Sequence, residues 1–353
     1  MRYLLVFLTF AAAVAFVLSI AVEVGWIGRS SPAPVGLATT APVGLATTAP
    51  NIPRATATIV VQKTAQAAIV AYYFAGPDDV KVSATGHVFV ADTLNDRVVE
   101  LGRKGTQFPS WGSHAIHRAA MNHPSRVLPL STGFITIDET NTRISRFSAT
   151  GSAVSRWTVQ GTLGAMTGPT DLALNPAGIM YLSDGNNDRI DELTPNGHLG
   201  KGWSTKGFLA SAQAGPNDPG FPGAMAIDRS GKVYVAYPNA GAVQKFSPDG
   251  VPIDKWQLPQ RGASANGVAV DGGGNVYVVD SGQATVTKFA PTGPLLTTWG
   301  GRGVGKNQLV HPTSIAVDSR GHVYVADAGN RRLGSFIKEW TSNGSFVRTY
   351  AFG

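Results

Sequence analysis

Residues with hard oxygen ligands stand at the start of several similar apolar segments in this chain. Asp78, Asp171 and Asn266 are the clearest of them. Carboxylate and amide oxygens suit Ca²⁺, so these three are candidate metal ligands. Polar side chains that simply face water are the simpler interpretation, and both stay open. Further candidate ligand-binding residues near the same segment starts are Asp79, Arg126 and Thr313.

Histidines supply a second possible metal chemistry. His123 and His311 each precede a proline that opens one of these segments, and His114 and His117 share one connection. Neutral imidazole is a common zinc ligand. Spacing alone does not bring three histidines together, so no cofactor is assigned, and calcium and zinc remain the candidates.

Arginines recur at a fixed distance from an aspartate. Arg97, Arg143 and Arg189 each follow an Asp by five residues, and most of these stretches read Asp-x-x-Asn-x-Arg. Asp and Asn stabilise turns through side-chain hydrogen bonds to the backbone, so the simplest role is structural. A set of such turns on a rigid scaffold would also present a polar surface to a partner.

The elements that position these residues repeat along the chain. The phrase GHVFVAD at 86–92 returns in related form five times, and each copy alternates apolar with other residues, which is typical of a strand. A second strand precedes each phrase, a third follows its turn, and a fourth ends in an aromatic residue. The later copies occupy 133–138, 178–184, 231–237, 274–280 and 321–327.

Four short strands every ~40–50 residues are the signature of a propeller blade. The sequence therefore predicts an all-β, six-bladed β-propeller of four-stranded antiparallel blades. The closing aromatics are expected to pack between blades, because one blade alone cannot bury both faces of its sheet. They are Trp111, Trp157, Trp203, Trp256, Trp299 and Tyr350.

Chain direction places the candidate residues on one side of this ring. Turns between second and third strands point to the same side as the starts of the inner strands. The Asp and Arg turns, the histidines and the polar segment starts should therefore share one face, around the mouth of the central channel. The stretch from Ile69 to Phe74 reads as a further strand that would help to close the ring; seven blades are the minor alternative.

The pattern P-x-x-h-A-h-D-x-x-G-x-h-Y-V-x-D-x-x-N-x-R-h, in which h is apolar, resembles the NHL repeat. It is clearest at 312–331 and 77–97, and the resemblance extends over six copies from Gly76 to Gly353. Blade four has Tyr237-Pro238-Asn239-Ala240-Gly241 in place of the polar turn. Blade five lacks the Arg, and blade six carries additional residues before Trp340.

This resemblance implies two functions. Exported NHL propellers of bacterial membrane proteins suggest a binding or sensor scaffold for a cell-envelope protein, peptide or glycan. Propeller lactonases similar to gluconolactonase and the amidating lyases suggest a metal-dependent lyase or hydrolase at the channel mouth. The ligating Glu usual in such lactonases has no counterpart at an inner-strand start in this sequence.

The N-terminus suggests a membrane anchor. The stretch from Leu4 to Val22 is interrupted only by Thr9 and Ser19, and its nineteen residues would span about 29 Å as a helix, close to the ~30 Å hydrocarbon core. No small-x-small cleavage site follows, which favours an uncleaved single-pass anchor with the propeller on the extracytoplasmic side. A cleaved signal peptide and a secreted protein are the alternative.

Domain boundaries follow from these features. We expect a signal anchor at 1–28, a linker at 29–66 with the duplicated octapeptide PVGLATTA, and the propeller at 67–353. The absence of cysteine excludes disulfides and thiolate sites. The net charge is +7 without any Lys/Arg-rich run, so a nucleic-acid partner is not expected.

Overall fold

The computed structural model describes residues 3–8, 18–23, 74–103, 106–112, 121–138, 143–158, 168–194, 197–205, 221–330 and 334–350. The chain divides into two units, Met1–Val70 and Ala71–Gly353. All the candidate site residues belong to the second unit.

In the first unit, two strands form a small antiparallel sheet. They are β1 (Tyr3–Leu8) and β2 (Leu18–Glu23), paired so that Leu4 lies opposite Val22. No helix among the described residues is long and apolar enough to span a membrane. The predicted transmembrane helix is therefore not seen, and the predicted linker at 29–66 lies outside the described residues.

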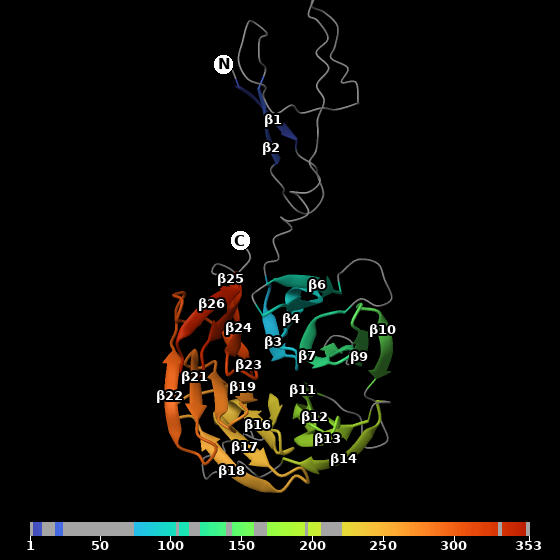
Figure 1. Ribbon diagram of the computed structural model, residues 1–353, viewed down its shortest axis with the longest axis vertical. Coiled ribbons are helices and arrows are strands. Elements are labelled where there is room, and N and C mark those ends of the chain that lie inside the picture. Colours follow the sequence, from blue (N-terminus) through green and yellow to red (C-terminus); the bar gives the residue numbers. More distant parts are fainter. Residues whose placement is uncertain are drawn as a thin grey trace, which may run out of the picture. The chain divides into compact units, whose positions relative to one another are not determined.

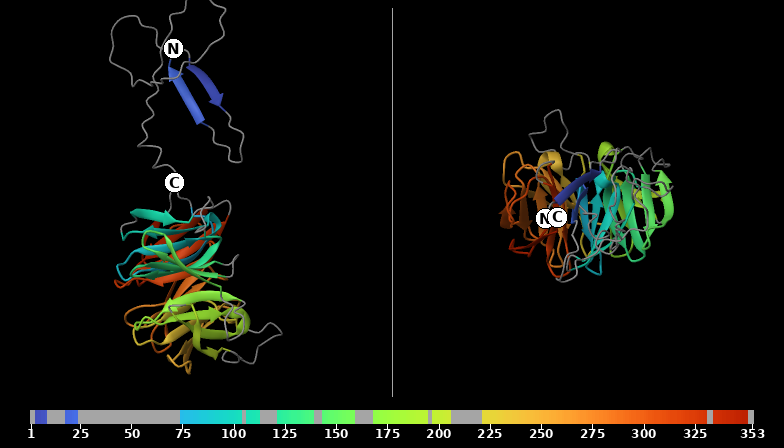
Figure 2. Two further views of the ribbon diagram at one scale, coloured as in Figure 1. Left: turned by 90° about the vertical axis from the view of Figure 1, so that its right-hand side faces the viewer. Right: turned by 90° about the horizontal axis from the view of Figure 1, so that it is seen from above.

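The second unit is a ring of six four-stranded antiparallel sheets, numbered blades 1 to 6 in chain order (Figure 1). Figure 2 shows the same sheets from two other directions. The all-β, six-bladed prediction is confirmed. Blades 1 to 3 consist of β3 (Pro77–Val82), β4 (Val88–Asp92), β5 (Arg97–Leu101) and β6 (Gln107–Trp111); β7 (Pro124–Leu130), β8 (Gly133–Asp138), β9 (Arg143–Ser148) and β10 (Ala153–Thr158); and β11 (Pro169–Leu174), β12 (Met180–Asp184), β13 (Arg189–Leu193) and β14 (Leu199–Ser204). Blades 4 to 6 consist of β15 (Met225–Ile227), β16 (Val233–Tyr237), β17 (Ala242–Phe246) and β18 (Pro252–Gln257); β19 (Ala265–Val270), β20 (Val276–Asp280), β21 (Thr285–Phe289) and β22 (Leu295–Gly300); and β23 (Pro312–Val317), β24 (Val323–Asn330), β25 (Gly334–Trp340) and β26 (Phe346–Tyr350).

The second strand of each blade is buried on both faces. In β4, β16 and β20 every residue is buried, because each sheet is covered by the blades on its two sides. The apolar cores lie between blades: Trp256 of blade 4 and Phe289 of blade 5 belong to one cluster. This packing explains why a single repeat cannot bury its own faces.

Four of the fourth-strand tryptophans, Trp111, Trp157, Trp203 and Trp299, pack against a glycine of the next blade. A Cβ on Gly250, whose φ is +80°, would lie 2.4 Å from Cγ of Trp203, and one on Gly151 would lie 1.9 Å from Cδ1 of Trp111. Only glycine leaves room for the indole and also adopts this left-handed backbone freely. The predicted role of these tryptophans between blades is confirmed.

This contact predicts a selective effect of added methyl groups. We expect Gly250→Ala to lower the free energy of unfolding by about 2–4 kcal/mol, from left-handed strain and displacement of Trp203. Gly262→Ala is the matched control, because Gly262 has φ +74° and a Cβ added there would meet nothing within 4 Å. Gly262→Ala should lower the free energy of unfolding by only about 1–2 kcal/mol. Urea unfolding of both variants measures the difference, and equal losses would contradict a role for the indole contact.

The ring is closed by contacts between blades 6 and 1. Thr313 Oγ1 donates to the carbonyl oxygen of Pro77 over 2.7 Å. Phe74 forms a single antiparallel bridge with Ser335, and Gly76 N donates to Ser335 Oγ over 3.2 Å. The outer strand of blade 6 is β26, from its own repeat. Of the predicted strand at 69–74, only Phe74 lies in the described residues, and it meets the third strand of blade 6.

Candidate functional site

Face I denotes the side of the propeller on which the inner strands begin and the second strands turn into the third. In blade 1 the Asp92 carboxylate organises this turn. It accepts hydrogen bonds from Ala75 N (2.6 Å), Asn95 Nδ2 (2.8 Å) and Arg97 Nε (2.6 Å). Burial raises the pKa of Asp92, and Arg97 offsets part of that rise. Arg97 is thus tied into the turn, as the structural interpretation expects.

The other two predicted arginines differ from each other. Arg143 repeats the blade 1 arrangement, since its Nη2 lies 2.8 Å from Asp138 Oδ2. Arg189 instead pairs with Asp191, two residues further along β13. Asp191 is 1% exposed; burial raises its pKa, and Arg189 offsets part of the rise. In blade 3 the arginine therefore pairs with an acid of its own strand and not with the aspartate that begins its turn.

The described histidines of face I lie in separate turns. His123 has a φ of +51°, and its backbone N donates to Asp96 Oδ1 over 2.7 Å. His311 is exposed, and its backbone N donates to Asp327 Oδ1 over 2.8 Å. His114 and His117 lie outside the described residues. Within the described part of the chain, no group of three or more His, Asp or Glu side chains is arranged to hold a metal ion.

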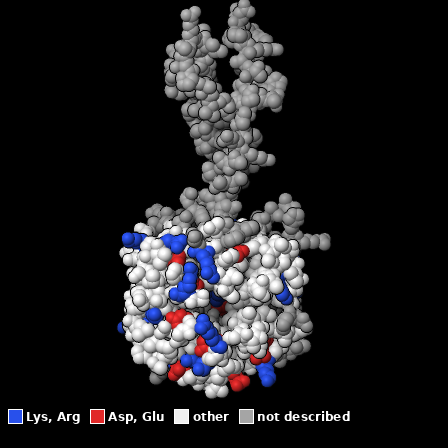
Figure 3. Space-filling view, viewed as in Figure 1, with Lys and Arg blue, Asp and Glu red and all other residues white. Residues whose placement is uncertain are grey.

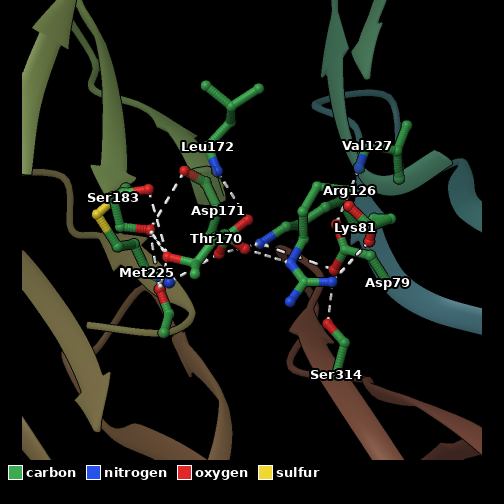
Figure 4. A network of polar contacts seen from close by, with 12 residues as sticks. Asp79, Lys81, Arg126, Val127, Thr170, Asp171, Leu172, Ser183, Met225 and Ser314 are labelled. Atoms are coloured by element: carbon green, nitrogen blue, oxygen red, sulfur yellow. Dashed lines mark hydrogen bonds and ion pairs between the residues drawn. The ribbon is translucent and has the colours of Figure 1, made fainter. Parts of the chain in front are cut away.

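A polar network joins the inner strands of blades 1, 2, 3 and 6 (Figure 4). It comprises Asp79, Lys81, Arg126, Thr170, Asp171 and Ser314, and is called the channel network below. Asp79, on β3, is 1% exposed. Its Oδ2 accepts from Val127 N of blade 2 over 3.0 Å, and its Oδ1 from Ser314 Oγ of blade 6 over 2.6 Å. One carboxylate therefore joins three blades.

The Lys81 side chain extends from blade 1 to an acid of blade 3. The sequence analysis did not include Lys81 among the candidate site residues. Its Nζ lies 3.1 Å from Asp171 Oδ2 and 3.9 Å from Asp79 Oδ1. Burial lowers the pKa of Lys81, but the two carboxylates outweigh burial and leave the pKa raised. The two carboxylates therefore favour the protonated form of Lys81. The sequence did hold a signal, because the other inner strands carry an apolar residue at this register position: Leu128, Ala173, Ala226, Ala269 and Ala316.

Asp171 has no carboxylate oxygen left without a donor. Oδ1 accepts from Leu172 N over 2.8 Å, and Oδ2 accepts from Met225 N of blade 4 over 2.7 Å as well as from Lys81. Arg126 Nε donates to the carbonyl oxygen of Thr170 over 2.6 Å. The channel network therefore connects blades 1, 2, 3, 4 and 6.

These contacts describe the surroundings of the predicted metal ligands. Asp171 already accepts hydrogen bonds from two backbone N–H groups and an ammonium group. Asn266 Oδ1 already accepts from Ser264 Oγ (2.8 Å) and Ser281 Oγ (2.7 Å). Asp78 is half-buried beside Asp79 on β3. The predicted ligands are thus divided between separate hydrogen-bonded groups, and Thr313 serves as the contact between blades 6 and 1 described above.

The face that Figure 3 shows carries basic and acidic side chains close together. No broad patch of one sign is visible on it, in keeping with the absence of a Lys/Arg-rich run.

Comparison with known proteins supports the repeat assignment. A family model described as the SMP-30/gluconolactonase/LRE-like region matches residues 140–266, and one for the NHL repeat matches residues 309–336. Both families are β-propellers, and the predicted NHL repeat is confirmed. No curated protein matches the chain in sequence.

Several solved structures share the fold. A streptogramin B lyase has a TM-score of 0.54 at 15% identity, covering 80% of this chain and 85% of that one. A catalytically inactive virginiamycin B lyase from Staphylococcus aureus with quinupristin has a TM-score of 0.52 at 14% identity, covering 80% and 86%. A gluconolactonase from Xanthomonas campestris has a TM-score of 0.54 at 16% identity, covering 75% and 86%. At these identities the likeness shows the propeller fold alone.

Proposed function

We propose that this protein is a non-catalytic binding propeller, tethered to a membrane by its N-terminal segment, which binds a protein, peptide or glycan of the cell envelope on face I. The observation that carries this proposal is the saturation of the channel carboxylates. Asp79 and Asp171 are 1% exposed, and every carboxylate oxygen that they hold accepts a hydrogen bond from the protein. These carboxylates hold neighbouring blades together through hydrogen bonds. We therefore place the binding site on the exposed surface of face I.

The surface of face I supports a partner that offers acceptors or acidic groups. The turn aspartates are buried, as Asp92 and Asp327 (both 0% exposed) illustrate. Arg261, Arg302 and His311 are exposed on the same face. Among the described residues of face I, these cationic side chains therefore face the solvent while Asp92 and Asp327 lie beneath the surface, and a rigid ring holds them in fixed relative positions.

Metal removal tests the proposal against the enzyme alternative. We expect the purified full-length protein to contain no stoichiometric Ca²⁺ or Zn²⁺ by elemental analysis, and its thermal midpoint to be the same with and without EDTA. A bound metal would stabilise the fold by mass action, so its removal would lower the midpoint. A stoichiometric ion that is lost in Asp171→Ala or His123→Ala would overturn the binding-only proposal.

A metal-dependent lyase or hydrolase at the channel mouth is the second candidate. It is favoured by the match to the SMP-30/gluconolactonase/LRE-like model over residues 140–266 and by the lyases and the lactonase among the similar structures. Fold alone does not transfer an activity. Turnover of a lactone or of a streptogramin B antibiotic by the purified protein, abolished by EDTA, would support this candidate.

The tether rests on the apolar run from Leu4 to Val22 and not on the fold, in which β1 and β2 are strands. We expect the full-length protein to sediment with membranes and to resist extraction by high salt and alkaline carbonate, because a ~30 Å apolar segment partitions into lipid. Deletion of residues 2–24 should move the protein to the soluble fraction. A soluble mature form of the intact gene product that starts near residue 25–30 would contradict the anchor.

A further inference from the structure

A cavity of about 220 Å³ lies between blades 2 and 3, on face II, the side opposite face I. It is near the turn from β7 to β8, and no residue of the channel network lines it. Its floor and walls are mainly apolar, and one cationic side chain reaches it. The residues that matter below are Leu130, Thr132, Ile135, Arg146, Trp157 and Met180.

The cavity lies where blade 2 departs from the repeat at one position and, at a neighbouring position, lacks an acid that three other blades carry. Ile135 lies opposite Arg146 in the register of β8 and β9. The residue at the equivalent register position in every other blade is aromatic: Phe89, Tyr181, Tyr234, Tyr277 and Tyr324. Blade 2 therefore lacks a ring, and the volume of that ring is left open beside Trp157.

The second feature is an acid that blades 4, 5 and 6 carry and that blade 2 lacks, as do blades 1 and 3 with Ser83 and Asn175. In blades 4, 5 and 6 the residue that ends the first strand is followed by an aspartate whose Oδ2 accepts from the tyrosine hydroxyl: Asp228, Asp271 and Asp318. Leu130 occupies this place in blade 2, one register step beyond Pro129. The local negative charge is therefore missing together with the hydroxyl that it would bind.

Arg146 faces this space without a carboxylate partner in the described part of the chain. Its one hydrogen bond there is long, from Nη2 to Thr132 Oγ1 over 3.4 Å. The lysines at the same register position in blades 4 and 5 have shorter or additional interactions with neighbouring groups. Lys245 lies 3.7 Å from Asp254 Oδ2 and over the ring of Tyr234, and Lys288 donates to the carbonyl oxygen of Ser342 over 3.1 Å.

We propose that this cavity binds a small organic acid, a carboxylate carried on an aromatic or short aliphatic body. Arg146 would take the carboxylate through paired N–H donors, the geometry in which Arg exceeds Lys. Ile135, Met180 and Trp157 would cover the apolar body. An engineered apolar cavity of ~150 Å³ binds benzene, so the volume of this cavity suits a single ring with a carboxylate at its edge. This site is separate from face I and goes beyond the function proposed above.

The test is a titration of the full-length protein with 4-methylbenzoate, followed by ligand-observed NMR and calorimetry. The uncharged isostere 4-methylbenzamide is the matched ligand, because it has the same shape without the charge. We expect saturable binding of the acid and at least tenfold weaker binding of the amide. Absence of saturable acid binding up to 10 mM, or equal binding of acid and amide, would overturn the proposal.

Two variants identify the site. Ile135→Tyr places in blade 2 the ring that most other blades carry, and should abolish binding of both ligands by filling the cavity. Arg146→Gln should weaken binding of the acid at least tenfold and leave the amide unchanged. Arg146 is half-buried at the cavity edge, so this variant remains informative if the buried Ile135 variant does not fold.

Arg156→Gln is the matched control, since Arg156 is exposed on β10 of the same blade and does not line the cavity. It should bind 4-methylbenzoate as the unchanged protein does. If Arg146→Gln and Arg156→Gln weaken the binding of 4-methylbenzoate equally, the effect comes from general surface charge and the proposed site is wrong.

Discussion

Lys81→Met should lower the free energy of unfolding by about 3–5 kcal/mol at neutral pH, the cost typical of removing one partner from a buried ion group. Asp79 and Asp171 are each 1% exposed and would lose their shared ammonium group. Methionine conserves most of the side-chain volume, so the loss reports on charge and not on a cavity.

The loss should depend on pH in a definite direction. Burial raises the pKa of Asp79, and Lys81 offsets part of this rise. Without Lys81 the pKa of Asp79 rises further. Because a raised folded-state pKa means that the folded protein takes up the proton more readily, the variant should regain stability as pH falls through that pKa. Urea unfolding at pH 7 and pH 5 measures this recovery.

Two further variants separate charge from other effects. Lys255→Met is the control, because Lys255 is exposed on β18 and should change stability by less than ~0.5 kcal/mol. Adding Asp79→Asn to Lys81→Met should recover part of the loss, since one buried charge is removed while the amide oxygen still accepts from Val127 N and the amide NH2 can donate to Ser314 Oγ. A loss below ~1 kcal/mol for Lys81→Met, or no recovery in the double variant, would show that the channel network does not stabilise the ring.

Trp256→Ala should lower the free energy of unfolding by about 3–5 kcal/mol, and Trp157→Ala by only about 1–3 kcal/mol. Trp256 is 2% exposed, lies in the core between blades 4 and 5, and donates from Nε1 to the carbonyl oxygen of Ala290 over 3.3 Å. Trp157 is half-buried and already borders the cavity between blades 2 and 3. A side chain next to open space loses fewer contacts when it is truncated.

Urea unfolding of the two variants under identical conditions provides the comparison. The two tryptophans occupy the same place in the repeat, so equal losses are expected if repeat position alone decides stability. Equal losses would therefore contradict the inference that the missing ring of blade 2 weakens the packing around Trp157.

Much of the fold could be predicted from residues close together in the chain. The second strand of each blade, from GHVFVAD onward, shows its alternation within seven residues, and the period of the repeat gives the number of blades. The packing of Trp111 and Trp256 between blades followed because a lone four-stranded sheet leaves its faces exposed. The turn role of Asp92 and Arg97 was also predictable, since the two residues are only five positions apart.

The candidate site was predicted less well, because its contacts join residues of different blades. Lys81 meets Asp171 across 90 positions, and Asp79 meets Ser314 across 235. No pattern inside one repeat states which side chains of other repeats will face it across the channel. The sequence therefore suggested Asp171 as a candidate ligand but did not predict its hydrogen-bond donors from blades 1 and 4.

The sequence by itself thus determined the strands, the blade count and the interblade role of the aromatics, because these depend on periodicity and on the burial that each repeat requires. Only the tertiary structure decided that the channel carboxylates are engaged, that Arg189 leaves its turn for Asp191, and that blade 2 holds a cavity beside Arg146. The physical reason is that closing the ring brings distant side chains within hydrogen-bonding distance, and their charges and volumes then compensate, or fail to compensate, one another.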